Sequence, residues 1–167
     1  MPAADLPTEA LTLAWAVQVG AATWEEVVAW ADAWILRLSA PTEDLLELSL
    51  SARKPNEAFT LLRRLAQRGD PDAALSMLAW KLRDGIDWQR INAVVLASHL
   101  ADMAALSLDE EPDDVRLPPL PPGFREAAWE LYSIADQRSF WLEEGVDRRE
   151  YDRNLSGEVA AMLQRFL

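Results

Sequence analysis

TWEEVVAWADAWILRL, residues 23–38, carries the clearest secondary-structure signal in the chain. Its first four residues form a capping box, in which the Thr23 side chain accepts from a free amide of the first turn and Glu26 reaches back to the amide of Thr23. Apolar residues then recur every three or four positions, as they do on the buried side of an amphipathic helix. The segment therefore predicts a helix that ends near Leu38.

Similar signals for helix starts and stops recur along the whole chain, whereas strand patterns are nearly absent. Thr8 is placed to cap a helix that stops at Gly20, and Thr42 is placed to cap a short leucine-rich helix. Further helices are expected over about 55–68, 71–83, 88–106, 124–144 and 156–166, with Asp70, Asp87 and Asp147 as additional caps. The sequence thus predicts an all-α protein.

We expect these helices to form one compact bundle of seven to nine helices. The hairpin Asn56–Arg83, with its Gly69-Asp70-Pro71 turn, resembles one unit of a helical repeat. A second copy at a fixed period is absent from the sequence, which favours a bundle with one repeat-like hairpin over a solenoid.

The length of 167 residues and the apolar content of 50% are typical of one globular domain, so residues 1–167 are expected to form a single helical domain. Residues 107–123 are different, because they hold a run of acidic residues followed by four prolines. Proline fixes φ and removes a backbone donor, so this stretch predicts an extended loop. It is also the one candidate sub-domain boundary.

The charge is unevenly distributed. The net charge is −12, with one basic and eight acidic residues in 1–50 and seven basic and 15 acidic in 101–167. Residues 51–100 carry eight basic and five acidic residues, and segment 53–68 is the most basic part. This basic segment either pairs with the acidic flanks on folding or forms a second binding face. Because nucleic-acid binding needs clustered Lys and Arg, we expect a protein partner with a basic surface and no nucleic-acid partner.

The composition excludes several kinds of active site. There is no cysteine and one histidine, His99, and neither phosphate-binding glycine motif occurs. Asp102 could orient the His99 ring, but no nucleophile is indicated beside it. The acidic pairs Glu25/Glu26, Glu43/Asp44 and Glu143/Glu144 are typical of solvated helix ends. We therefore expect no enzyme activity, no metal and no cofactor.

The candidate partner-binding residues lie in the acidic loop. They are Asp109, Glu110, Glu111, Asp113 and Asp114. These carboxylates lack the alternating spacing, the central glycine and the closing glutamate of an EF-hand calcium loop. They are placed to meet Arg or Lys of a partner, and any of the eight tryptophans left exposed by folding would serve as an apolar anchor.

The N-terminal sequence has no secretory signal pattern, and Ala14–Leu38 contains too many charged residues to cross a bilayer. A cytoplasmic protein without a membrane partner is expected.

One stretch carries a family resemblance. Trp30-Ala31-Asp32, Ile35, Pro41 and Leu45-Leu46-Glu47-Leu48-Ser49-Leu50 resemble a pattern near the N-terminus of small helical bacterial proteins of unknown function. Some of these are presumed immunity proteins that are encoded beside polymorphic toxins. The resemblance implies a non-enzymatic inhibitor that covers a basic toxin domain with carboxylates. The alternatives are a homo-oligomeric scaffold, whose acidic and basic segments meet across subunits, and a carboxylate-dependent enzyme.

Overall fold

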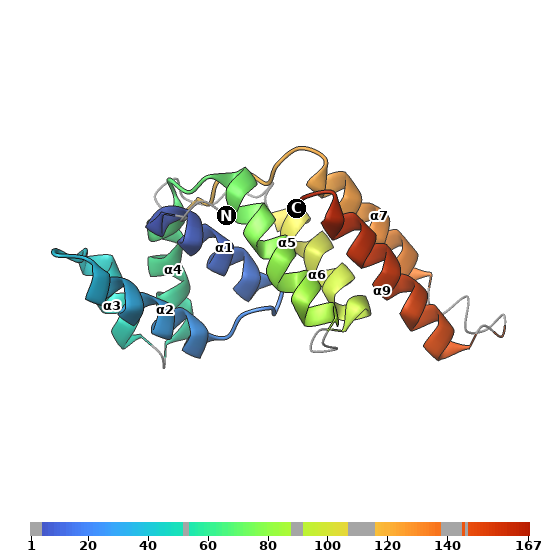
Figure 1. Ribbon diagram of the computed structural model, residues 1–167, viewed down its shortest axis with the longest axis horizontal. Helices are drawn as coiled ribbons and strands as arrows, with labels where there is room; N and C mark the ends of the chain where they lie inside the picture. The colour runs from blue at the N-terminus through green and yellow to red at the C-terminus, as the bar shows by residue number, and fades with distance from the viewer. Residues whose placement is uncertain (1–4, 52–53, 88–91, 107–115, 138–144, 146) are drawn as a thin grey trace. The chain divides into compact units, whose positions relative to one another are not determined.

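The computed structural model describes residues 5–51, 54–87, 92–106, 116–137, 145 and 147–167. Every regular element in those ranges is an α-helix, and there are eight of them in the described residues (Figure 1). They are α1 (Leu6–Gln18), α2 (Trp24–Arg37), α3 (Glu43–Leu50), α4 (Pro55–Ala66), α5 (Pro71–Asp87), α6 (Ala93–Leu106), α7 (Phe124–Asp136) and α9 (Arg148–Gln164). The predicted all-α bundle of seven to nine helices is therefore confirmed.

The chain folds into two compact units. Unit 1 comprises Met1–Ala74 and Glu110–Pro119, and unit 2 comprises Leu75–Asp109 and Leu120–Leu167. Helix α5 begins in unit 1 and continues in unit 2. Each unit is described separately below, and the single domain expected over residues 1–167 stays a prediction.

Unit 1 is built around α1 and α4, which pack against each other. Helix α3 packs on both α4 and α2, so a chain of neighbouring helices runs from α1 through α4 and α3 to α2. The core of this unit consists of large side chains that are almost fully buried, among them Leu11, Trp15, Leu45, Leu48 and Leu62. Two threonines of α1 tie it to the start of α5, because the Asp70 amide donates to Thr8 Oγ1 (3.1 Å) and Thr12 Oγ1 donates to the Ala74 carbonyl (3.3 Å).

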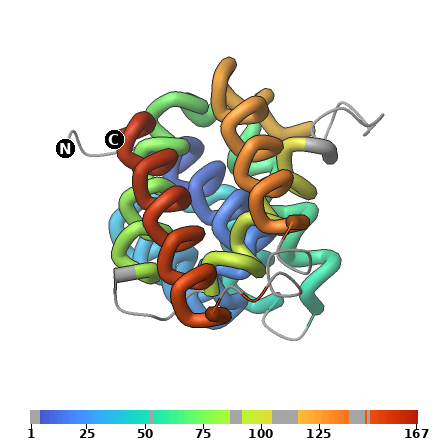
Figure 2. Tube along the Cα trace, turned by 90° about the vertical axis from the view of Figure 1, so that its right-hand side faces the viewer, coloured from blue at the N-terminus to red at the C-terminus, as the bar shows by residue number. Residues whose placement is uncertain are grey.

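Unit 2 is built around α6, which packs on α7 and α9, while α7 and α9 also pack on each other. These last two helices lie side by side in both ribbon and tube views (Figures 1 and 2). Phe124 at the start of α7 is fully buried and meets the Phe166 ring edge-on, with 5.3 Å between the ring centroids. The ends of α7 and α9 are therefore held together by aromatic packing.

Local sequence signals place most helix starts correctly. The predicted capping box of α2 is present, with the Thr23 amide donating to Glu26 Oε2 (2.8 Å) and the Glu26 amide donating to Thr23 Oγ1 (3.3 Å). Asp70 and Asp147 accept from first-turn amides of α5 and α9, as expected. Gly20 follows α1 with a positive φ of 70°, so the predicted stop is also confirmed.

Four predicted boundaries are wrong. The cap of α1 is Asp5, which accepts from the Thr8 amide (3.0 Å), so Thr8 lies inside the helix. Asp87 is the last residue of α5, and α6 is capped by Asn92, which accepts from the Val94 amide (2.9 Å). Helix α7 ends at Asp136 and Gln137 forms a turn, so the helix predicted over 124–144 is interrupted there; residues 138–144 lie outside the described part. Helix α9 begins at Arg148 and not near Ser156, because Tyr151 and Leu155 of its polar first half are also buried.

Candidate functional site

The five acidic residues predicted to meet a partner, Asp109, Glu110, Glu111, Asp113 and Asp114, lie outside the described residues. Their role stays a prediction.

The tryptophans divide into three groups by exposure. Trp15 is buried in the core of unit 1, and Trp24, Trp30 and Trp34 are half-buried. Trp80 and Trp129 are exposed, and Trp88 and Trp141 lie outside the described residues. Exposed indoles are therefore found in unit 2, whereas the tryptophans of α2 serve the fold of unit 1.

A single carboxylate oxygen explains the position of the two central tryptophans of α2. Glu9 Oε2 on α1 accepts from Trp30 Nε1 (2.7 Å) and from Trp34 Nε1 (2.8 Å). The two indoles are one turn apart, so both reach the same oxygen. This arrangement holds α2 on α1 and leaves the opposite side of α2 free to meet α3.

Three exposed leucines form the most unusual surface of unit 1. Leu36 on α2 is 87% exposed, and Leu50 and Leu46 on α3 are 85% and 44% exposed. We call these three residues the α2–α3 leucine surface. Single exposed leucines are ordinary, but three on two packed helices are typical of an interaction site.

A hydrogen bond joins the two helices that carry these leucines. Ser49 Oγ on α3 donates to Asp32 Oδ1 on α2, which fixes the two helices side by side. Leu36 lies one turn beyond Asp32 on α2, and Leu50 lies one turn beyond Leu46 on α3. All three leucines are turned away from the buried residues of their own helices, which are Val27 and Ala31 on α2 and Leu45 and Leu48 on α3.

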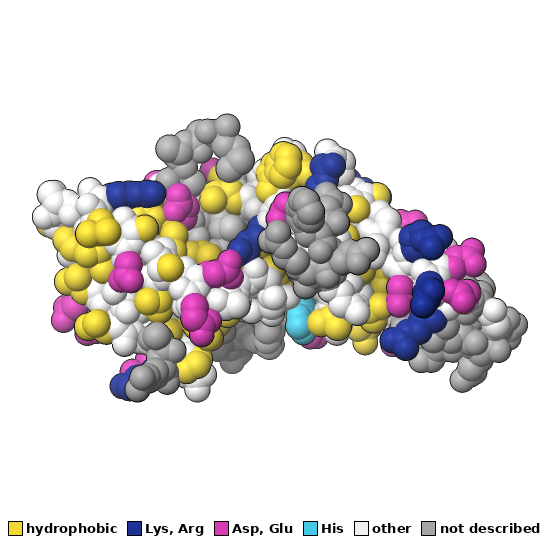
Figure 3. All heavy atoms as spheres, turned by 60° about the horizontal axis from the view of Figure 1, so that its bottom comes forward, with side chains coloured by type: hydrophobic (Ala, Val, Ile, Leu, Met, Phe, Trp, Pro, Cys, Tyr) yellow, Lys and Arg dark blue, Asp and Glu magenta, His cyan; other side chains and the backbone are white. Residues whose placement is uncertain are grey.

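Acidic residues accompany the leucine surface. Residues 24–50 contain six acidic residues and one basic residue, Arg37, for a net charge of −5. Asp32, Glu43 and Glu47 are exposed on the same two helices. Figure 3 shows hydrophobic and acidic side chains interspersed over the end of unit 1 where α2 and α3 lie. Such a surface favours a partner that is both apolar and basic.

Sequence reasoning assigned the leucines of α3 to one short helix but did not separate those that face outward. Four leucines in eight residues occupy more than one side of the helix, and only Leu45 and Leu48 are buried. Leu45 and Leu48 are three residues apart, as on a narrow buried stripe of a helix, and this places Leu46 and Leu50 on the other side. This spacing is the sequence signal from which the outward leucines could have been predicted.

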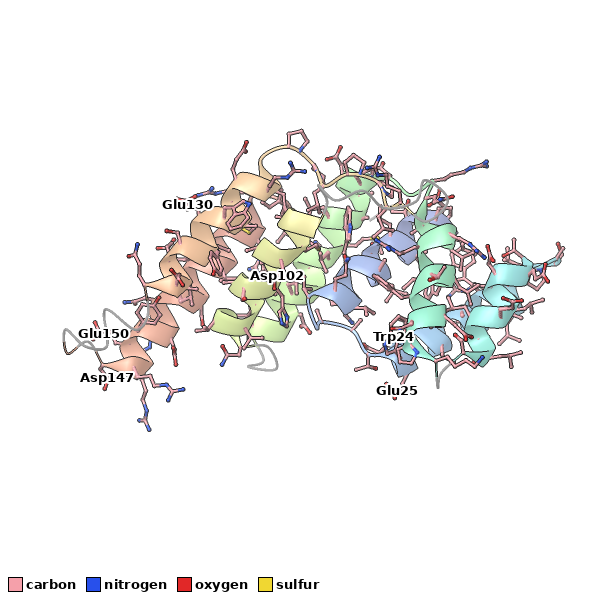
Figure 4. All side chains as sticks on the ribbon, turned by 180° about the vertical axis from the view of Figure 1, so that it is seen from behind. Trp24, Glu25, Asp102, Glu130, Asp147 and Glu150 are labelled. Atoms are coloured by element: carbon pink, nitrogen blue, oxygen red, sulfur yellow. The ribbon has the colours of Figure 1, made fainter. Side chains whose placement is uncertain are left out.

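The carboxylate pairs noted in the sequence lie at helix starts. Glu25 and Glu26 are in the first turn of α2 (Figure 4), where Glu26 completes the capping box. Glu43 and Asp44 are in the first turn of α3, and Asp44 lies 3.6 Å from Arg64 Nη1 of α4. Glu143 and Glu144 lie outside the described residues. Helix capping and the helix dipole account for the positions of the described pairs.

The single histidine is half-buried on α6, and Asp102 on the following turn is exposed (Figure 4). Over the described ranges, no three His, Asp or Glu side chains gather as ligands of a metal ion would.

The basic segment 53–68 is partly paired inside unit 1. Lys54 Nζ lies 2.9 Å from Glu57 Oε2, and Arg64 reaches Asp44 as described above. The Arg63 guanidinium lies over the Phe59 ring at 5.1 Å. Arg53 lies outside the described residues. These contacts favour internal pairing of this segment over a second binding face.

Comparisons of the chain with protein-family models, with curated proteins and with solved structures gave no match. The resemblance to small helical immunity proteins therefore stays a prediction. Across the described residues, no helix combines the length and the apolar character that crossing a bilayer requires.

Proposed function

We propose that this chain is a non-enzymatic protein-binding domain whose α2–α3 leucine surface holds a partner that is both apolar and basic. The observation that supports it most directly is the exposure of Leu36 and Leu50, at 87% and 85%, in a segment of net charge −5. Burial of one leucine side chain yields about 1.5–3 kcal/mol, so three leucines can hold a partner at useful affinity. The surrounding carboxylates would select basic partners and speed their association.

Charge also argues against self-association through this surface. A symmetric dimer would place two copies of the same acidic segment face to face, and like charges across an interface oppose binding. A basic partner of another sequence has the opposite effect. The homo-oligomeric scaffold is thus the less favoured alternative.

The narrower form of the proposal is an immunity-type inhibitor of a basic toxin domain, acting in the cytoplasm. Covering a cationic active site with carboxylates blocks access of a negatively charged substrate without any catalytic group. This form rests on the acidic charge and on the sequence resemblance.

A designed peptide tests the general proposal. The probe is a fluorescein-labelled peptide of about 18 residues with leucines at helical spacing and lysines between them, and a scrambled peptide of equal composition is its control. We expect binding to the helical peptide alone, measured by fluorescence anisotropy. The double variant Leu36→Ser/Leu50→Ser should weaken it at least tenfold. Val95→Ser, an exposed apolar residue of unit 2, is the matched control.

Equal binding of the helical and scrambled peptides, or equal binding by wild type and the double variant, would refute the proposal. Sedimentation of the wild-type chain as a dimer that the double variant abolishes would support the scaffold instead. For the narrower form, the chain should restore growth of cells that express a toxin encoded beside it, and the double variant should fail to do so.

A further inference from the structure

A second surface, on α7 of unit 2, has a different chemistry. Its exposed side carries a ridge of four residues spaced three, three and four apart: Glu126, Trp129, Tyr132 and Asp136. Residues with these spacings lie along one side of a helix. We call these four residues the α7 ridge. An aromatic pair is thus flanked by one carboxylate before it and one after it.

The aromatic pair is ordered and open to solvent. Trp129 is 46% exposed and Tyr132 is 36% exposed, and their rings meet edge-on with 5.8 Å between centroids. In an edge-to-face pair the rim of one ring meets one face of the other, so at least one face of the indole points away from Tyr132. Trp and Tyr are enriched among the residues that dominate binding energy at protein interfaces.

The opposite side of α7 is firmly held. Phe124, Ala127, Ala128 and Leu131 are buried in unit 2, where α7 packs on α6 and α9. The Tyr151 hydroxyl on α9 donates to the Ile134 carbonyl, which fixes the second half of the helix. The ridge is therefore a rigid platform, so a partner would not have to order it on binding.

Charge indicates what the ridge binds. Residues 124–136 hold three acidic residues and one basic residue, for a net charge of −2. Glu126 and Asp136 belong to the ridge, and Glu130 is exposed beside it on α7 (Figure 4). A guanidinium or ammonium group would find an aromatic face and a carboxylate within one helical turn of each other.

The chain itself shows how such a cation sits on its aromatic residues. The guanidinium groups of Arg37, Arg63 and Arg83 lie over the rings of Trp34, Phe59 and Trp80 at 5.5, 5.1 and 5.9 Å. Trp80 is exposed like Trp129, so this stacking forms at a solvent-accessible indole. An arginine from a partner could adopt the same geometry on Trp129.

The length of the ridge sets the spacing of the cations. Glu126 and Asp136 are ten positions apart on the helix, which corresponds to about 15 Å at 1.5 Å per residue. An extended peptide covers that distance in about four or five residues, at about 3.3 Å each. The terminal carboxylates therefore match two basic residues of an extended segment at that spacing, with a third between them over the indole.

We propose that the α7 ridge binds an extended basic segment of a protein partner, with an arginine stacked on Trp129 and two further basic residues paired with Glu126 and Asp136. The site lies wholly in unit 2 and shares no residue with the α2–α3 leucine surface. It therefore does not rest on the function proposed above, and the peptide that tests it carries no leucine.

The test uses the full chain and three peptides of Gly, Ser and Arg. The first has three arginines, the outer two separated by the matching spacing of about five residues, the second has the same three arginines adjacent, and the third has aspartate in place of arginine. Binding is followed by the indole N–H signals in ¹H–¹⁵N correlation spectra, with the Trp129 signal assigned from its loss in Trp129→Phe. We expect the first peptide to shift the Trp129 signal and to bind most tightly.

Matched variants separate the ridge from general acidity. Trp129→Ala should weaken binding of the first peptide at least fivefold, and Glu126→Gln/Asp136→Asn should weaken it at low salt and flatten its salt dependence. Trp80→Ala removes the other exposed indole within the described residues of unit 2 and should leave the affinity unchanged. All the substituted side chains are exposed, so we expect each variant to fold. An unchanged helical content by circular dichroism checks this.

Equal affinity of Trp129→Ala and wild type, or equal affinity of the first two peptides, would overturn the proposal. A loss of affinity in Trp80→Ala as large as that in Trp129→Ala would do the same. Concentration-dependent dimerisation that disappears in Trp129→Ala would also overturn it, because the ridge would then bind a second copy of the chain.

Discussion

Substituting the glycine between α4 and α5 tests the packing of unit 1 directly. A Cβ on Gly69 would lie 2.6 Å from the Pro7 carbonyl oxygen and 3.0 Å from Leu11 Cβ, both on α1. The nearest atom belongs to the backbone of a packed helix, so α1 must move to admit it. Overpacking of this kind costs about 1–3 kcal/mol. Gly→Ala substitution also restricts the conformations of the unfolded chain, and this offsets about 0.4–1 kcal/mol of the overpacking cost. We expect Gly69→Ala to lower the free energy of unfolding by about 1–2 kcal/mol.

The matched control is Gly157→Ala on α9 of unit 2. Gly157 is exposed in the middle of a 17-residue helix, and a Cβ there would meet no atom within 4 Å. Alanine is favoured over glycine in a helix interior by about 0.5–1 kcal/mol, so this variant should be stabilised. Gly→Ala should therefore lower the free energy of unfolding at position 69 and raise it at position 157.

The assay is urea unfolding followed by circular dichroism, combined with amide hydrogen exchange of α1 and α9 to locate the effect in its unit. Gly69→Ala should speed exchange in α1, and Gly157→Ala should slow exchange in α9. Unfolding free energies that rise in both variants would refute the close approach of α1 to Gly69.

Three further substitutions test individual hydrogen bonds. Glu9→Ala removes the shared acceptor of two half-buried indoles, and we expect a loss of about 1–3 kcal/mol in urea unfolding, with Glu9→Gln losing less. Hydrogen bonds from the side chain and the amide of Thr8 hold the pKa of Asp5 below its ordinary value of 3.8. The stability advantage of Asp5 over Asp5→Asn should therefore be present above that value and disappear as the pH falls through the folded-state pKa, as unfolding at a series of pH values will show. Tyr151→Phe removes the donor to the Ile134 carbonyl and should lower the free energy of unfolding by about 1 kcal/mol. The measurement is the melting temperature, which should fall.

Helix starts could be predicted from the sequence wherever the capping interaction is local. Thr23 and Glu26 meet within one turn, and Asp147 needs only the amides two and three residues later. The error at Thr8 has a local cause too. Pro7 is tolerated in the first turn of a helix, so α1 starts before it and Asp5 takes the capping position.

The candidate sites depended on information that the sequence does not hold. The acidic loop could be predicted because its acidic residues and prolines are consecutive in the sequence. The α2–α3 leucine surface could not, because it exists only where α4 covers one side of α3 and leaves Leu46 and Leu50 uncovered. In the same way, sequence predicted that some tryptophans would be exposed anchors but not which ones. Trp30 and Trp34 are engaged by Glu9, which lies 21 and 25 residues away in the chain, and no spacing rule predicts that contact.

The two proposed surfaces should respond differently to salt. Raising the ionic strength from 0.01 M to 0.15 M shortens the screening length from about 30 Å to about 8 Å. The screening length of about 8 Å is shorter than the distance of about 15 Å between the two ends of the α7 ridge. Each basic residue of a bound peptide then interacts only with the carboxylate next to it, so the affinity of the peptide should fall steeply. Apolar burial on Leu36, Leu46 and Leu50 is not screened, so a partner held there should keep most of its affinity.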